Sequence, residues 1–306
     1  MSIHLAGDHP FENTPSLEAK ALRINLNDNI YGTFAEIGAG QEVARHFFRC
    51  GGASGTIAKT MSAYDKDFSD AIYGREDDGR YVSESRLNKM LNWEISLLEK
   101  RIDRSKNKDK LFFAFANTVS ALNYHKNNEC HGWMGIRFQL EPMGEMHDII
   151  LHVRMLDREN RLQQEAVGML GVNLVYGAFH LTENPDEFIK SLADGIDIER
   201  IEIDMIEFNG PDFEKFDNRI LCLKLTQSGL TDAIMFDQQG FVVQASEVLY
   251  KKSCLIERGS FRPVTKVNLD MLEKAKKQFV SREQVEEENL VVFMELTLGS
   301  LTDSGT

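Results

Sequence analysis

The chain has no apolar run long enough to cross a membrane and no apolar core of the secretion-signal type. Its first residues are polar and include His4, Asp8, His9 and Pro10, whereas a signal peptide needs a continuous apolar segment. The richest apolar stretch, residues 166–181, is interrupted by glycines and an asparagine, and it is shorter than the ~20 residues that span a bilayer. These absences predict a cytoplasmic protein with no membrane partner.

Cysteine is scarce, and no two cysteines lie close together in the sequence. Cys50, Cys130, Cys222 and Cys254 lie far apart, and no C-x-x-C pair occurs. A large chain without a secretion signal rarely depends on disulfides. We therefore expect four reduced thiols, and we expect Cys222 to be buried because leucines flank it.

Several catalytic and metal-binding motifs are missing. No G-x-x-x-x-G-K-[ST], H-E-x-x-H or G-x-S-x-G occurs, which removes the main support for phosphate-loop, zinc-protease and serine-hydrolase functions. The best metal candidates are His125, Cys130 and His131, joined by His147 or His152. Their H-x-x-x-x-C-H spacing is not that of a zinc site. We expect no metal, and the sequence identifies no cofactor.

Positive charge is also in short supply. The 306 residues carry a net charge of −13, which argues against general nucleic-acid binding because phosphate neutralisation needs a surplus of cations. With 42% hydrophobic and 27% charged residues, the composition is that of a globular protein. Two stretches, residues 100–110 and 251–266, are nevertheless basic. The first suits the negative end of a helix dipole.

Helix and strand signals alternate along the chain. Ser83 begins an amphipathic helix that reaches about residue 104, residues 111–119 resemble a buried strand, and residues 133–141 and 147–156 form a hairpin with one apolar face. Residues 22–26 suggest a short strand. Asn184 and Pro185 mark the start of a helix. The last part of the chain follows the order strand, helix, strand.

These signals predict a mixed α/β fold of three-layer type in two loosely divided halves. We expect a flexible arm at residues 1–20, a mixed α/β half at 21–181, and an α/β half at 182–306 that ends in a βαβ-like unit. The chain stops soon after its last predicted strand. That strand edge lacks a covering element, which suggests a truncated C-terminus.

Residues 33–49 allow two interpretations. In the first, Thr33 and Glu36 form the capping box of one continuous helix that Gly51 ends; the two interior glycines then cost about 1 kcal/mol each. In the second, a strand, a turn at Gly38 and Gly40, and a helix imitate the first motif of S-adenosylmethionine-dependent methyltransferases. We favour the continuous helix.

The best candidate anion site lies in the second basic stretch. Gly259 allows the backbone to bend between Arg258 and Arg262, and two guanidinium groups near a bend can hold a phosphate or carboxylate in bidentate fashion. Lys251 and Lys252 would add positive charge. The alternative is a turn whose arginines pair with the acidic surface.

Polar residues of the predicted hairpin form a second charged group. Arg137, His152 and Arg154 share its polar face and need an anionic partner, either an internal carboxylate or a ligand. Internal pairing is the commoner solution, but His152 and Arg154 could also extend the anion site. Glu202 and Asp204 share one face of the strand predicted at residues 200–208. A solvated sheet edge explains this pair more readily than acid–base chemistry does.

Three segments resemble a bacterial family of uncharacterised proteins: YGTFAEIGAGQEVAR at residues 31–45, MLDREN at 155–160 and ERGSFRPVT at 257–265. The likeness runs from about residue 22 to residue 298, and members of the family are longer at the C-terminus. Such sequences sometimes carry the labels nicotinate-nucleotide adenylyltransferase and TonB-dependent receptor, and the motifs support neither. CHGW at residues 130–133 departs from H-x-G-H, and an outer-membrane receptor needs many alternating strands. The resemblance implies no catalytic residue.

Three functions follow as expectations. The first is a cytoplasmic enzyme or binding protein that acts on a phosphorylated or nucleotide-like small molecule, with Arg258 and Arg262 holding the anion and Arg154 and His152 assisting. The second is a non-enzymatic interaction or assembly protein, and the third is a methyltransferase-like enzyme. A small anionic metabolite is the expected partner, and the oligomeric state is left open.

Overall fold

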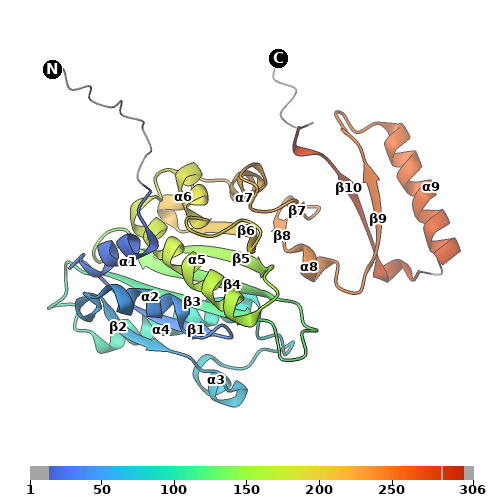
Figure 1. The fold of residues 1–306 in the computed structure, drawn as a ribbon. Coiled ribbons are helices and arrows are strands. Elements are labelled where there is room, and N and C mark those ends of the chain that lie inside the picture. The colour runs from blue at the N-terminus through green and yellow to red at the C-terminus, as the bar shows by residue number, and fades with distance from the viewer. Residues whose placement is uncertain (1–13, 284, 300–306) are drawn as a thin grey trace, which may run out of the picture. The chain divides into compact units, whose positions relative to one another are not determined.

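The computed structural model describes residues 14–283 and 285–299 and divides the chain into two compact units, residues 1–233 and 234–306 (Figure 1). Nine α-helices lie in the described residues: α1 (Leu17–Asn25), α2 (Glu42–Cys50), α3 (Lys66–Tyr73), α4 (Glu84–Arg101), α5 (Asn160–His180), α6 (Pro185–Leu192), α7 (Asn218–Gln227), α8 (Ala245–Val248) and α9 (Lys266–Glu283). The strands are β1 (Ile30–Ile37), β2 (Ile57–Met61), β3 (Leu111–Ser120), β4 (His131–Gln139), β5 (Met146–Met155), β6 (Ile201–Asn209), β7 (Met235–Phe236), β8 (Val242–Val243), β9 (Ser253–Arg258) and β10 (Leu290–Glu295).

A six-stranded mixed sheet forms the centre of the first unit. Its order is β2-β1-β3-β4-β5-β6; β1 is parallel to β2 and β3, and the remaining neighbours are antiparallel. The carboxyl ends of β1 and β3 therefore meet the start of β4, the end of β5 and the start of β6 at one edge. Since β1 lies between the two strands that follow it, the topology changes direction there, as it does where open α/β sheets bind ligands.

Helices cover both faces of this sheet. Thr33 of β1 donates a hydrogen bond to Glu94 of α4, whereas the ring of the next residue, Phe34, lies 5.1 Å from that of Phe47 in α2. Successive strand residues point to opposite faces, so α2 and α4 belong to different layers. Helix α5 packs on β4, β5 and α2. The predicted mixed α/β fold with three layers is confirmed.

Local signals correctly located several elements. The Ser83 hydroxyl accepts the N–H of Arg86 and caps α4, and Asn184 caps α6 directly before Pro185. Strands β4 and β5 form the predicted hairpin, and β3 is the predicted buried strand. Cys222 is buried as predicted, and burial raises its pKa to about 12.

The continuous helix predicted for residues 33–49 is wrong. Residues 30–37 form strand β1, which lies between β2 and β3, and the chain turns at Gly38 and Gly40, whose φ angles are +101° and +76°, before α2 begins. A Cβ on Gly38 would lie 1.7 Å from the carbonyl oxygen of Val119 in β3, so the turn packs against the neighbouring strand. The short strand predicted at residues 22–26 is also wrong. Those residues continue α1, which buries Ala21 and Ile24.

The predicted domain limits differ from the observed units. The expected boundary near residue 181 falls between α5 and α6, which pack against each other inside the first unit. Of the predicted arm, residues 1–13 lie outside the described residues, whereas Leu17 to Lys20 form the start of α1. The Lys20 side chain is buried and its Nζ donates to Asn173 and Asp194, so this segment is anchored to the fold.

The second unit contains the predicted βαβ arrangement. Strands β9 and β10 are parallel, and α9 connects them; β7 and β8 form a separate two-stranded hairpin. Asn268 of α9 donates to Glu257 of β9. The helix therefore covers the face of the strand pair on which Glu257 lies. Across the described residues of both units, no helix is long and apolar enough to cross a membrane.

Candidate functional site

A chain of three hydrogen-bonded side chains crosses β4, β5 and β6. His152 Nδ1 lies 2.6 Å from Asp204 Oδ1, and His152 Nε2 lies 3.1 Å from His131 Nδ1. His152 is buried, the side chain of Asp204 is 12% exposed, and His131 is half-buried. We call Asp204, His152 and His131 the relay. It connects a shielded carboxylate to an imidazole that reaches the protein surface.

Strand pairing and one bulge bring the relay together. In the β4–β5 ladder, His152 is opposite Trp133, and His131 is opposite Arg154. In the β5–β6 ladder, His152 pairs with Met205 but Val153 pairs with Ile203. The residue between them, Asp204, is therefore the extra residue of a bulge. Bulges redirect side chains and are frequent beside active sites.

With both imidazole rings neutral, the hydrogen bonds assign one tautomer to each ring of the relay. A carboxylate only accepts, so His152 donates from Nδ1 to Asp204, and its Nε2 accepts the Nδ1 proton of His131. The lone pair of His131 is then on Nε2. This nitrogen makes no hydrogen bond to the described residues and is not sealed from solvent. Burial lowers the pKa of His131, and the neighbouring His152 and Arg80 lower it further, so the ring is neutral at pH 7.

Aromatic and charged groups surround the relay. The Trp133 ring lies 4.9 Å from that of His152 in an edge-on arrangement, and its buried Nε1 has no hydrogen-bond partner within the described residues. Arg154 pairs with Glu202 at 2.7 Å, and Glu202 also accepts from Thr231. The relay is thus shielded on one side and flanked by charge on the other.

The structure places the predicted site residues in separate groups. His152 and Arg154 belong to the first unit, and each has a carboxylate partner, as Arg137 also has in Asp148. Internal pairing, the commoner of the two explanations for this hairpin face, is what the structure contains.

The four cations predicted for the anion site lie in the second unit. Arg258 pairs with Glu295 at 2.7 Å, and Lys252 donates to the carbonyl of Glu288. The Lys251 ammonium lies 5.0 Å from the centroid of a tyrosine ring, and Arg262 lies in the turn after β9. An anion site formed by these residues stays a prediction.

The glycine turn after β1 leads to a helix start that is already occupied. The buried carboxylate of Glu36 accepts the N–H groups of Val43 and Ala44 at 3.1 and 2.9 Å and a weaker bond from Asn117. Gln41, at the N-cap position, makes no capping bond. Glu36 thus replaces the ligand that a helix N-terminus attracts. The methyltransferase-like function loses the support of a free helix N-terminus.

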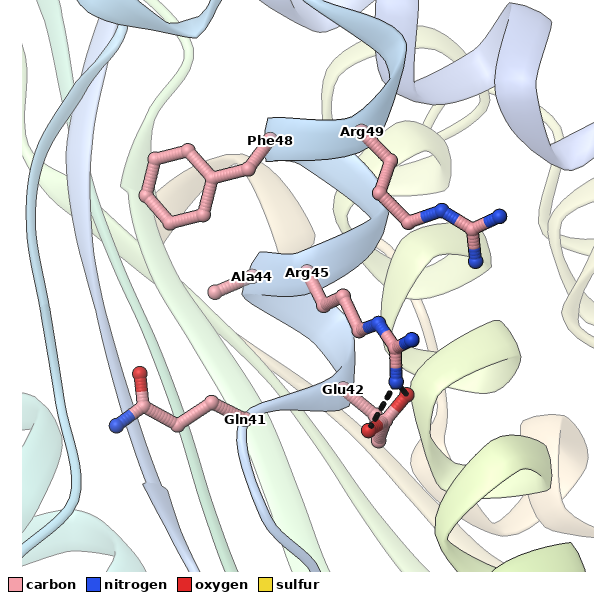
Figure 2. A pocket seen from close by; sticks show the side chains of 6 residues that line it. All are labelled: Gln41, Glu42, Ala44, Arg45, Phe48 and Arg49. Carbon is pink, nitrogen blue, oxygen red and sulfur yellow. Dashed lines mark hydrogen bonds and ion pairs between the residues drawn. The ribbon is translucent and has the colours of Figure 1, made fainter.

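Burial raises the pKa of Glu36 to about 7, although the two N–H groups of α2 oppose this rise. A hollow of about 460 Å³ lies along α2 after this turn, and Figure 2 shows the six residues that line it. Its arginine at the helix start, Arg45, bonds Glu42, and its aromatic residue, Phe48, is half exposed. The Glu42 carboxylate that lines the hollow is therefore engaged by Arg45.

Sequence reasoning considered each relay residue without joining them. His131 and His152 were candidate metal ligands, and Asp204 was grouped with Glu202. Within the described residues, no three His, Cys, Asp or Glu side chains are placed to hold a metal. Alternation predicts that His152 and Arg154 share one face of the hairpin and that Glu202 and Asp204 share one face of their own strand, but the pairing of β5 with β6 has no local signal.

Comparisons with known proteins give only partial likenesses to solved structures. No protein-family model and no curated protein sequence matches the chain. Among solved structures, competence/damage inducible protein CihA from Agrobacterium tumefaciens matches 52% of this chain and 93% of its own, with 18% identity and a TM-score of 0.37. Competence-damaged protein (CinA) superfamily proteins from Enterobacter cloacae and Escherichia coli each match 58% of this chain at 12% identity and a TM-score of 0.40, covering 98% and 95% of their own chains. These likenesses assign no residue a role.

Proposed function

We propose that the protein is an enzyme that acts on a phosphorylated or nucleotide-like small molecule, with His131 as its general base and acid. The observation that carries this proposal is the relay from Asp204 through His152 to His131. A buried carboxylate that orients an imidazole is the arrangement that activates histidine bases in enzymes. Its location supports the same conclusion, because His131 lies opposite Ser120 at the carboxyl end of β3.

The proton path follows from the hydrogen bonds. His131 Nε2 takes a proton from a substrate O–H or from water, and the ring becomes an imidazolium. Its Nδ1 proton remains hydrogen-bonded to His152, whose own proton is held by Asp204, so the new charge is stabilised through two bonds. The same Nε2–H can then protonate a leaving group. A positioned base of this kind contributes about 10²–10⁴-fold in rate.

Charges of both signs lie near His131. Arg154 faces His131 across the β4–β5 ladder and pairs with Glu202. The charge of Arg80 lowers the pKa of His131, whereas Glu129 and Asp204 raise it. A phosphate or carboxylate group on the substrate would compensate the imidazolium that forms when His131 takes a proton.

A turnover screen tests the proposal. The protein is incubated with sugar phosphates, nucleotides and other phosphorylated metabolites, and products are detected by ³¹P NMR and mass spectrometry. His131→Gln should lower any turnover about 10²–10⁴-fold, and Asp204→Asn should also lower it by disturbing the tautomer of His152. His180→Gln is the control, since His180 is exposed and outside the relay. No turnover by the wild type, or turnover that His131→Gln leaves unchanged, would refute the proposal.

A second candidate function, protein interaction, is favoured by the open face of the β9–β10 pair. Because Glu257 faces α9, alternation puts Cys254 and Ile256 on the other face, next to Val291 and Phe293 of β10. Ile256 is 51% exposed. Sedimentation of the wild type and of Ile256→Glu tests this function: self-association that the substitution abolishes would support it, and a monomer in both cases would exclude self-assembly through this face.

A further inference from the structure

A second hollow lies where the loop of residues 121–130 meets the first turn of α5. Its volume is about 470 Å³. Its polar lining comes from two short segments: Asn123, Tyr124, Lys126, Glu159, Asn160 and Arg161. The loop leads directly into β4, whose first residue is His131. The hollow and the relay therefore share one end of the sheet.

Hydrogen bonds hold the walls of this hollow together. The N–H of Leu122 donates to Gln163 of α5, and the Asn160 amide donates to the carbonyl of Leu122, both at 2.7 Å. The N–H of Asn123 donates to Asn128 at 2.9 Å. The loop is thus tied to the helix before any ligand arrives, which reduces the ordering cost of binding.

The charged side chains that line the hollow are not ion-paired within the part of the chain that the structure describes. Lys126 and Arg161 form no ion pair with the described residues, and Glu159 forms none either. Arg154 and Arg258, by contrast, each hold a carboxylate at 2.7 Å. Lys126 and Arg161 can therefore bind an anionic group without first breaking an ion pair, and the positive end of the α5 dipole adds to their attraction.

The remaining lining favours a sugar over a nucleobase. Tyr124 is 95% exposed, and its ring is steadied by an edge-on contact with His125 at 5.5 Å. One exposed ring offers its negative face to the C–H groups of a pyranose, whereas no second aromatic side chain lines the hollow to sandwich a base. Two amides and one carboxylate supply both donors and acceptors, as vicinal hydroxyl groups require.

We infer that this hollow binds a sugar phosphate. Lys126 and Arg161 hold the phosphate, the Tyr124 ring packs on the sugar, and Glu159 and Asn160 bond its hydroxyl groups. The inference rests on the proposed function, since it names the substrate class of that enzyme. It assigns recognition to residues other than those that transfer the proton.

Calorimetric titration with glucose 6-phosphate tests the inference, with glucose, inorganic phosphate and adenosine monophosphate as comparison ligands. Glucose 6-phosphate should bind more tightly than each of the other three. Arg161→Gln should weaken it at least about tenfold, and Tyr124→Ala about fivefold. Arg158→Gln is the matched control: Arg158 is exposed and lies three residues before Arg161, but it does not line the hollow.

The outcomes separate this inference from the proposed function. His131→Gln should leave the affinity for glucose 6-phosphate within about twofold, because His131 does not line the hollow. If His131→Gln leaves turnover unchanged but Arg161→Gln still abolishes the binding of glucose 6-phosphate, the sugar-phosphate site is supported and the proposed role of His131 is refuted. No binding of glucose 6-phosphate, equal losses in Arg158→Gln and Arg161→Gln, or tighter binding of adenosine monophosphate would each overturn the inference.

Discussion

The two units of the chain bury their apolar side chains to very different extents. In the first unit, both faces of the sheet are covered, and side chains such as Phe34, Phe115 and Trp133 are almost completely buried. In the described part of the second unit, residues 234–283 and 285–299, no hydrophobic side chain is buried. Ile256 and Leu269 are more than half exposed there.

The packed core of the first unit makes it the better support for a precisely positioned chemical site. A parallel strand pair is normally covered on both faces, and a two-stranded sheet alone is marginally stable. The β9–β10 pair has a helix on one face, so its geometry depends on hydrogen bonds and one helix contact. The relay, by contrast, lies on strands whose neighbours are fixed by a packed core, which is what a base positioned to a fraction of an ångström requires.

Replacing one phenylalanine in each unit should give the largest difference in the free energy of unfolding. Phe34→Ala should lower the free energy of unfolding by about 3–5 kcal/mol, because the ring contacts Phe47, Phe113 and Phe115. Phe293→Ala, on the half-exposed β10, should cost about 1 kcal/mol or less. Denaturant titration followed by circular dichroism measures both. Equal losses would show that the second unit has a core comparable to the first.

Matched glycine substitutions should give the next largest effect. Gly38→Ala forces a Cβ to within 1.7 Å of the Val119 carbonyl at a φ of +101°, and we expect a loss of about 2–4 kcal/mol. Gly259→Ala meets only the ring of Phe261 at 3.0 Å, which can move, so the loss should be below about 1 kcal/mol. Thermal unfolding of the two variants ranks them, and the reverse order would contradict the observed turn after β1.

The stability of the first unit should depend on pH through Glu36. Its pKa in the folded protein is about 7, above the ordinary value of 4.5, so the folded state binds the proton more tightly than the unfolded state does. The resulting stability is complete below pH 4.5 and is lost as the pH rises through about 7, by at most about 3 kcal/mol. Denaturant titrations from pH 4.5 to 8 measure this slope, and Glu36→Gln should flatten it. An identical slope in the variant would rule Glu36 out as the titrating group.

Surface ion pairs should show the smallest effects and no difference between the units. Arg154→Gln breaks the pair with Glu202, and Arg258→Gln breaks the pair with Glu295. Both guanidinium groups are more than half exposed, so each loss should be about 0–1 kcal/mol. A substantially larger loss for Arg258→Gln would mean that this pair is a main support of the β9–β10 sheet.

The sequence predicted the elements whose signals are local. Ser83 caps α4 and Asn184 caps α6 through bonds within one turn, and the β4–β5 hairpin is visible in its alternating residues. The helix prediction for residues 33–49 is wrong because β1 is buried on both faces, so its sequence lacks the alternation of polar and apolar residues that would distinguish a strand from a helix. The decisive contact, Gly38 against Val119, joins positions far apart in the chain.

The relay could not be predicted from the sequence, because its hydrogen bonds also join positions far apart in the chain. His152 lies in the predicted hairpin, whereas His131 precedes the strand predicted at residues 133–141 and joins the pairing because β4 begins two residues earlier. The position of Asp204, however, depends on the bulge opposite His152 and Val153. The sequence of residues 201–209 contains no local signal that predicts this bulge. The residues of the second hollow were missed because they come from a loop and from the first turn of α5, and no periodic pattern links residues 122–126 to residues 159–161.

The relay should keep His131 neutral with its lone pair on Nε2. A pH titration by ¹⁵N NMR of protein labelled at histidine nitrogens, with His131→Gln to assign the signals, measures this directly. We expect a proton on Nδ1 of His131 and none on Nε2 at pH 7, and a pKa below the ordinary 6.5 because of burial. Asp204→Asn should weaken that preference. A proton on Nε2 of His131 at neutral pH, or a preference unchanged in Asp204→Asn, would contradict the relay.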